Sequence, residues 1–159
     1  MKFMCAVSPE GYMAQGPEDD MVWTPQIDKQ IFQIVSALDG GICLVSKQTL
    51  SNMPRFLTGR TLIPISSNGL TLEQAYEKFP NALLVSGPTL LKDANRLSDY
   101  DTPIIQDLII NQVDIQLLGQ DIPEEYRFPF DILTNYHKVI EVQFQDMKTT
   151  IYRHSLRSE

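Results

Sequence analysis

The chain has few of the side chains that bind metal ions or form disulfides. It contains two cysteines and two histidines in 159 residues. Cys5 and Cys43 each lie in an apolar, strand-like run without a second cysteine or a histidine pair nearby, which gives no zinc motif and favours reduced thiols in a cytosolic core. His137 and His154 also lack a neighbouring ligand, so surface or hydrogen-bonded roles are favoured. We expect no metal site.

Positive charge is scarce as well. The 13 lysines and arginines stand against 20 acidic residues, for a net charge of −7, and they form no run that would neutralise phosphates. We therefore expect no nucleic-acid partner, and any anionic ligand must be bound by a few local cations.

Long hydrophobic runs are missing. No apolar stretch approaches the roughly 20 residues of a membrane helix. The segment from Met1 to Val7 is too short for a signal peptide and has the pattern of a strand. We expect no membrane association and a cytoplasmic location.

The composition of the chain is that of an ordinary globular protein, with 43% hydrophobic and 21% charged residues. Its length predicts one domain spanning residues 1–159. Over the first two thirds, strand and helix patterns alternate, as in a parallel sheet with crossover helices. Strands are expected at Lys2–Val7, Ile42–Val45, Thr61–Ile65 and Ala82–Val85. Helices are expected at Pro25–Leu38, Gln48–Met53, Leu72–Phe79 and Pro88–Leu97, with Thr71 and Gln74 as a capping box before the third.

Beyond Asp107 the pattern changes to strands without intervening helices. They are expected at Leu108–Val113, His137–Phe144 and Lys148–Tyr152, the last two as an antiparallel hairpin. The sheet should thus be mixed, parallel in the middle and antiparallel at its C-terminal edge. Pro64 removes a ladder donor, which places its strand near a sheet edge or at a bulge. The polar connection Leu118–Glu125 suggests no function.

The segment Ser8–Val22 is rich in glycine, proline and acidic residues and predicts a mobile loop. It should lie over the carboxyl end of the sheet, where open α/β folds bind ligands.

One carboxylate accompanies the apolar stripe of the first helix. Thr24 suits the N-cap and Pro25 the first helical position. The stripe Ile27, Ile31, Ile34, Val35 and Leu38 follows at helical spacing until Gly40-Gly41. Asp28 and Phe32 share one side of the helix, so an acid and a ring would form one pocket wall. The alternatives are an inward acid that holds a ligand and an ordinary first-turn acid that complements the helix dipole.

Several motifs occur in an order that resembles the dihydrofolate reductase family over essentially the whole chain. Trp23, Asp28 and Phe32 have the family's spacing of a tryptophan, an acid and a phenylalanine. The later motifs are Ser46-Lys47-Gln48-Thr49, Thr58-Gly59-Arg60, Ser66-Ser67, Ser86-Gly87-Pro88 and the hairpin segment Lys148–Arg153. The resemblance implies a mixed, mainly parallel sheet of about eight strands with four flanking helices and an antiparallel C-terminal hairpin.

The resemblance also implies an activity, the reduction of 7,8-dihydrofolate by hydride transfer from NADPH in a monomeric protein that antifolates inhibit. Asp28 would accept paired hydrogen bonds from the pterin and favour its protonated form. Asn111 stands where the family has a threonine that bonds to the acid, and Trp23 and Met21 complete the implied catalytic group. The implied substrate contacts are Cys5, Ala6, Asp28, Lys29, Phe32, Met53, Leu57, Arg60 and Val85, with Arg60 clamping a glutamate carboxylate. On the residues alone, Arg60 equally suits a surface turn, and Phe32, Met53 and Leu57 equally suit core packing.

The implied cofactor contacts are mostly small or hydroxylic. They are Ala6, Met13, Ala14, Ser46, Lys47, Gln48, Thr49, Ser66, Ser67, Ser86, Gly87, Pro88, Thr89 and Leu90. Lysine, hydroxyls and helix N-terminal amides together suit an anion. This chain departs from the family pattern at Ser46 and Ser86 (glycine in the family), at Lys47 (arginine), at Thr89 (often a cation) and at Lys29 (often apolar).

Two other interpretations remain. The chain could keep the fold as a binding or structural component, or it could be another pteridine or pyrimidine reductase of related fold. The Trp23–Asp28–Phe32 spacing speaks against the second of these.

Overall fold

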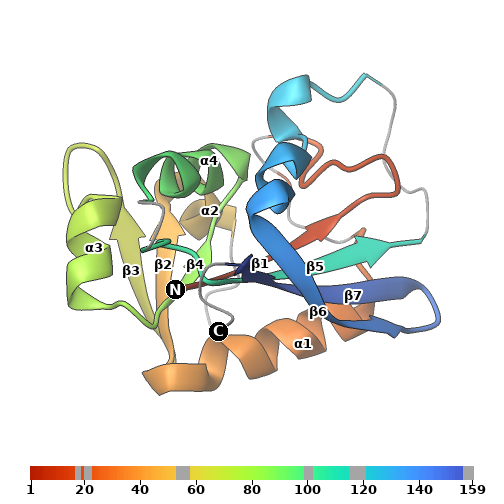
Figure 1. Ribbon diagram of the computed structural model, residues 1–159, viewed down its shortest axis with the longest axis horizontal. Helices are drawn as coiled ribbons and strands as arrows, with labels where there is room; N and C mark the ends of the chain where they lie inside the picture. Colours follow the sequence, from red (N-terminus) through yellow and green to blue (C-terminus); the bar gives the residue numbers. More distant parts are fainter. Residues whose placement is uncertain (17–18, 20–22, 53–57, 99–101, 115–120, 156–159) are drawn as a thin grey trace.

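The computed structural model describes residues 1–16, 19, 23–52, 58–98, 102–114 and 121–155. These residues form a seven-stranded mixed sheet with the strand order β3-β2-β4-β1-β5-β7-β6 (Figure 1). The strands are β1 (Lys2–Val7), β2 (Ile42–Ser46), β3 (Thr61–Ile65), β4 (Leu83–Val85), β5 (Asp107–Val113), β6 (Tyr136–Gln143) and β7 (Met147–His154). The helices are α1 (Gln26–Ala37), α2 (Lys47–Asn52), α3 (Leu72–Lys78) and α4 (Pro88–Leu97), with short 3-10 turns η1 (Leu38–Gly40), η2 (Glu124–Tyr126) and η3 (Phe130–Asn135).

The predicted sheet is confirmed in its main features. Strands β1 to β5 pair in parallel, whereas β5–β7 and β6–β7 pair antiparallel. Pro64 lies on β3, an edge strand, as its missing donor predicts. The expected count of about eight strands is wrong for the part of the chain described, which holds seven. The residue patterns themselves give seven strand ranges, and only the resemblance suggests one more.

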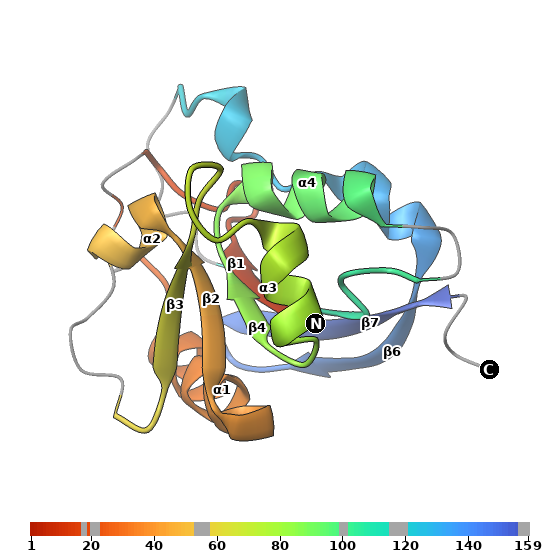
Figure 2. The same cartoon turned by 90° about the vertical axis from the view of Figure 1, so that its left-hand side faces the viewer.

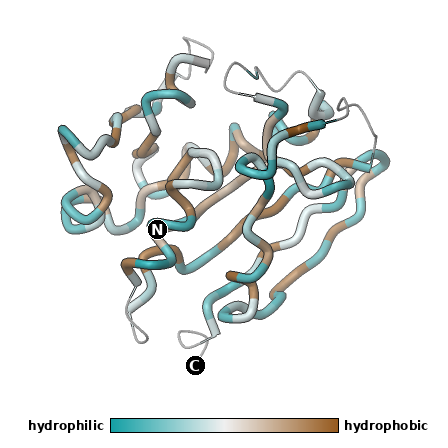
Figure 3. The backbone as a smooth tube through the Cα atoms, turned by 90° about the horizontal axis from the view of Figure 1, so that it is seen from above, coloured by the Kyte–Doolittle hydropathy of each residue, from teal (hydrophilic) through white to brown (hydrophobic). Residues whose placement is uncertain are grey.

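Two hydrophobic layers cover the two faces of the sheet. Alternate strand residues such as Phe3 and Leu84 pack with α3 and α4, while Met4 and Cys43 pack with Val35 of α1. In Figures 1 and 2, α1 accordingly lies below the sheet and α4 above it. Figure 3 shows hydrophobic residues along the central strands, as this two-sided burial requires.

Helix α1 starts one residue later than predicted. Pro25, rather than Thr24, is the N-cap, and no side chain caps the helix. The Thr24 hydroxyl and carbonyl instead accept hydrogen bonds from Lys29 Nζ, at 2.7 and 2.9 Å. By contrast, the Thr71–Gln74 capping box of α3 is present as predicted.

The buried face of α1 is rotated from the predicted stripe. Val35 is buried and Ile31 and Phe32 pack beside it, but Ile34 is 66% and Leu38 is 50% exposed. Successive helical residues turn by about 100°, so a face centred between Ile31 and Phe32 excludes Ile34 and includes Asp28. The acid therefore lies on the face that packs against the sheet, not beside it.

The turn η1 that follows α1 ends at a glycine, Gly41. Gly41 has φ +73°, and a Cβ there would lie 2.7 Å from the Gly59 carbonyl oxygen. Its own carbonyl accepts the Thr61 N–H at 2.9 Å, which starts β3 beside β2. A side chain at this position would be both strained and in collision.

Candidate functional site

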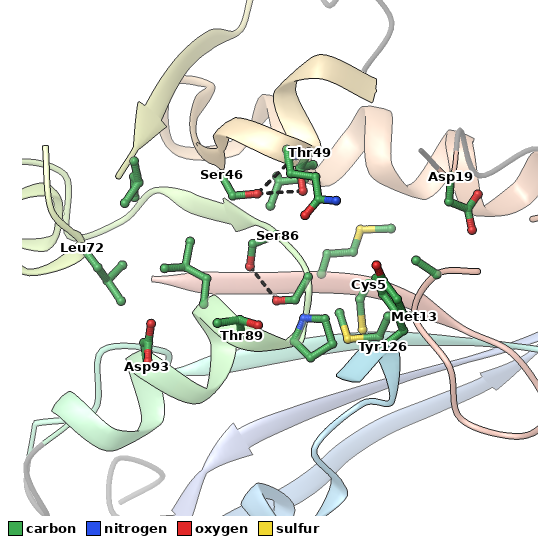
Figure 4. A pocket seen from close by; sticks show the side chains of 18 of the residues that line it. Cys5, Met13, Asp19, Ser46, Thr49, Leu72, Ser86, Thr89, Asp93 and Tyr126 are labelled. Carbon is green, nitrogen blue, oxygen red and sulfur yellow. Dashed lines mark hydrogen bonds between the residues drawn. The ribbon is translucent and has the colours of Figure 1, made fainter. Parts of the chain in front are cut away.

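A cavity of about 890 Å³ opens at the carboxyl ends of the parallel strands. Ser46 ends β2, Ser66 follows β3 and Ser86 follows β4, and all three line it. In Figure 4, Cys5, Met13, Asp19 and Tyr126 lie toward one end of this cavity, and Leu72, Thr89 and Asp93 toward the other. Open α/β sheets bind ligands at this edge, and the volume suits a ligand of several rings.

Most of the predicted binding residues line the cavity. On the predicted substrate side these are Cys5, Ala6, Asp28, Lys29, Phe32 and Val85. On the predicted cofactor side they are Met13, Ala14, Ser46, Gln48, Thr49, Ser66, Ser67 and residues 86–90. Met21, Met53 and Leu57 fall outside the described residues, so nothing is said of their placement. The structure thus brings together residues that the sequence spreads over about half its length.

Two buried side chains of the sheet support the Asp28 carboxylate, Asn111 directly and Thr149 through Asn111. Asn111 Nδ2 donates a hydrogen bond to Asp28 Oδ1 at 2.8 Å, and Thr149 Oγ1 donates to Asn111 Oδ1 at 2.7 Å. Asn111 is fully buried and Thr149 is 8% exposed. Asp28 itself is only partly buried and lines the cavity, so its carboxylate is both anchored and reachable.

Cys5 of β1 lines the same cavity as Asp28 and is close enough to feel its charge. Burial, and in second place the Asp28 carboxylate, raises the pKa of the Cys5 thiol far above its ordinary value. The thiol is therefore a neutral, apolar part of the cavity wall and not a nucleophile. This is consistent with the reduced core thiol that the sequence predicts.

Trp23 lies behind the cavity wall. The ring is 4% exposed, and its Nε1 donates to Asp19 Oδ2 at 2.8 Å. The same oxygen accepts the Gln15 N–H at 2.7 Å. Asp19 lines the cavity, whereas Trp23 does not. Trp23 is therefore linked to the site by its hydrogen bond to the Asp19 carboxylate. Nothing in the sequence distinguishes Asp19 from the neighbouring acids.

Neither of the two cations expected to bind anions lines the cavity formed by the described residues. Lys47 is exposed. Arg60 is used to fasten α1 to the turn before β3: Nε donates to Ser36 Oγ at 3.1 Å and a terminal nitrogen donates to the Thr58 carbonyl at 2.7 Å. The other terminal nitrogen donates to the carbonyl and side chain of Gln33, which itself lines the cavity.

Hydroxyls and mixed charges characterise the rest of the cavity. Ser46 Oγ donates to Thr49 Oγ1 at 2.9 Å and accepts the Thr49 N–H at 3.3 Å, and Ser86 Oγ donates to the Gly87 carbonyl at 3.0 Å (Figure 4). No peptide bond of the described residues is cis, including the one between Ser86 and Gly87. Glu73, Asp93 and Arg96 also line the cavity, and the sequence did not indicate them.

The start of the predicted loop is fastened to a distant segment. Met13 N–H donates to the Tyr126 carbonyl at 2.8 Å, and Phe128 N–H donates to the Gly11 carbonyl at 2.9 Å. Arg127 donates to the Glu10 carbonyl and to the Tyr12 hydroxyl, at 2.7 and 3.0 Å. These bonds tie residues 10–13 to the segment 126–128, and the mobility expected of Ser8–Val22 stays a prediction.

The segment that holds the loop also reaches the cavity. Glu125 and Tyr126 of η2 line it, so the connection that suggested no function ends at the site. Only the folded chain brings this segment beside Met13, which explains why the local pattern gave no signal.

Among the described residues no group of three or more His, Cys, Asp or Glu could hold a metal ion, and no helix is long and apolar enough to cross a membrane. No family model matches this chain, and no curated protein sequence matches it.

Proposed function

We propose that this protein reduces 7,8-dihydrofolate to tetrahydrofolate with NADPH, as a monomer in the cytoplasm and with a dihydrofolate reductase-like fold. The observation that carries the proposal is the Asp28 carboxylate, held by buried Asn111 at the wall of a large cavity. A carboxylate so anchored accepts paired N–H donors from a flat heterocycle. Helix-dipole stabilisation alone would need neither the buried Asn111 donor nor a place at the cavity wall.

The residues lining the cavity fit a phosphate-bearing dinucleotide in shape and donor type. Small side chains at Ala6 and Ala14 leave room for a flat ring near the backbone, and Ser46, Thr49 and Ser67 offer hydroxyls further along. Helix α4 begins at Pro88 against the same cavity, where backbone N–H groups and the helix dipole favour an anion. When bound, NADPH supplies the hydride.

The protein's own part in the reaction is orientation and charge. Asp28 orients the pterin and favours its protonated imine, while Asn111 keeps the carboxylate in place by donating to Oδ1. Phe32, one turn along α1, presents its ring to the same wall. As the family resemblance implies, the proton itself would reach the substrate through water.

A second candidate function is binding without turnover by a protein of the same fold. It is favoured by the placement of Lys47 and Arg60, because neither cation lines the cavity as the described residues form it.

The deciding experiment mixes the protein with NADPH and dihydrofolate and follows NADPH absorbance. We expect turnover that methotrexate inhibits, with Asp28→Asn as the inactive control. No turnover together with a thermal shift from NADPH or methotrexate would favour the second candidate. No turnover and no thermal shift from either compound would reject both.

A further inference from the structure

A threonine outside the cavity is bonded in series with the proposed catalytic acid. Thr149 and Asn111 are direct partners across the β5–β7 ladder, and their side chains lie on the face of the sheet that α1 covers. The Thr149 hydroxyl donates to Asn111 Oδ1 at 2.7 Å, and Asn111 Nδ2 donates to Asp28 Oδ1 at 2.8 Å. The three side chains come from β7, β5 and α1.

The orientation of the Asn111 amide decides what Asp28 meets. An amide's oxygen and nitrogen have nearly the same shape, so the surrounding hydrogen bonds determine which of them points which way. With Nδ2 toward Asp28, a donor faces the carboxylate. With Oδ1 toward Asp28, two acceptors would face each other and the hydrogen bond would be lost.

The Thr149 hydroxyl distinguishes these two orientations. Among the residues that the structure describes, its side chain bonds only to Asn111. If the amide turned over, the hydroxyl would accept from Nδ2 and its own proton would lose its acceptor. A buried donor without an acceptor is costly, so the hydroxyl favours the orientation in which Nδ2 faces Asp28.

We propose that Thr149 is a positioning residue that fixes the Asn111 amide and thereby keeps a hydrogen-bond donor facing Asp28, which in turn accepts from a protonated pterin or diaminopyrimidine. Its effect on turnover rests on the proposed function. Its effect on the orientation of the Asn111 amide does not, because that is a property of the protein alone.

Other charged groups line the same cavity as Asp28 and remain unchanged in the test. Lys29 neighbours Asp28 on α1, but its Nζ is bonded to Thr24, and the Cys5 thiol on β1 is neutral. Asp19 lines the cavity, as do Glu73, Asp93, Arg96 and Glu125. A substitution at Thr149 removes none of these charges, so we expect its effect on Asp28 to come through Asn111.

The primary test follows hydrogen exchange of the Asn111 side-chain NH2 group by NMR in the protein without ligand. Thr149→Val keeps the shape but removes the hydroxyl, and we expect this exchange to become about tenfold faster because the amide loses one of the bonds that fix it. Thr149→Ser should restore the original rate. Thr150→Val is the matched control, because Thr150 is also buried, lies one residue along β7 and points to the opposite face. Should the valine variant not fold, Thr149→Cys, with its weaker donor, should give a smaller increase.

A methotrexate titration of the same variants gives the second readout. In Thr149→Val we expect affinity to fall by about tenfold near neutral pH. Unchanged exchange of the Asn111 NH2 group in Thr149→Val, or an equal increase in Thr150→Val, would overturn the role of Thr149 while leaving the proposed function intact. Faster exchange in Thr149→Val, in a protein without turnover or methotrexate binding, would support the role of Thr149 and reject the proposed function.

Discussion

The two ends of the cavity are built differently. Near Cys5, polar side chains are hydrogen-bonded to buried partners, as Asp28 is to Asn111 and Asn111 is to Thr149. Near Leu72, the charged side chains are exposed and pair with each other, as Arg96 does with Asp93 at 3.1 Å. Buried, fully bonded groups hold one geometry, whereas exposed ion pairs contribute little and rearrange easily. We therefore infer that the end near Cys5 orients a ligand in one geometry. The end near Leu72 would attract charged ligand groups without fixing their geometry.

The sharpest test of this comparison is Asp28→Asn. The amide keeps the shape but removes the charge, so we expect turnover to fall by roughly a hundredfold or more. Circular dichroism and the melting temperature should stay close to wild type. Unchanged turnover would show that another group performs the role given to Asp28.

Asn111→Leu should have the next largest effect. It removes the donor to Asp28 and the acceptor for Thr149 together, and we expect unfolding to become easier by about 1–3 kcal/mol. Urea denaturation would measure the loss, and antifolate binding would weaken with it. Asn111→Thr, whose hydroxyl can also donate to Asp28, should retain most of the binding; a loss as large as in the leucine variant would contradict the role of a hydrogen-bond donor at this position.

At the other end, single charge changes should matter much less. Arg96 and Asp93 are 71% and 41% exposed, so Arg96→Ala should raise the KM for NADPH by no more than about fivefold. Asp93→Asn, which removes a like charge from a phosphate site, should lower that KM slightly. Both effects should shrink as salt increases. A hundredfold change in either variant would show that this end is as specific as the Asp28 end.

The smallest expected effect concerns the Cys5 thiol. Because burial is the larger cause of its raised pKa and the Asp28 charge the smaller, Asp28→Asn should leave the thiol neutral and slow to react. Alkylation at about pH 8, followed by mass spectrometry, should label Cys5 rapidly in denatured protein and slowly in folded protein, both in the wild type and in Asp28→Asn. Rapid labelling of folded Asp28→Asn would show that charge, not burial, protects the thiol.

Local patterns predicted the elements well and the contacts between them only in part. The capping box of α3, the Pro64 edge strand and the hairpin depend on neighbouring residues and could be predicted. The α1 stripe was placed wrongly at Ile34 and Leu38 because a helical pattern fixes the period but not which side faces the sheet.

Long-range contacts account for the site residues that the sequence did not reveal. Thr149 joins the site through the register of β5 against β7, and Tyr126 through a backbone bond to Met13. The sequence could place Arg60 in the turn before β3. It could not show that the guanidinium would be bonded to α1 and not line the cavity. Side-chain reach and strand register follow from the complete fold, so a single sequence gives little information about them.

The bonds behind Asp28 also say something about the order of assembly. Asn111 is 83 residues from Asp28 along the chain, and Thr149 is a further 38 residues beyond Asn111. A chain emerging from the ribosome can form α1 long before β7 has been made. Contacts between such distant residues form late and slowly. The Asp28 carboxylate therefore gains its complete set of supporting bonds only when the C-terminal hairpin docks. We expect a nascent or truncated chain to lack these bonds even where the parallel half of the sheet has already folded.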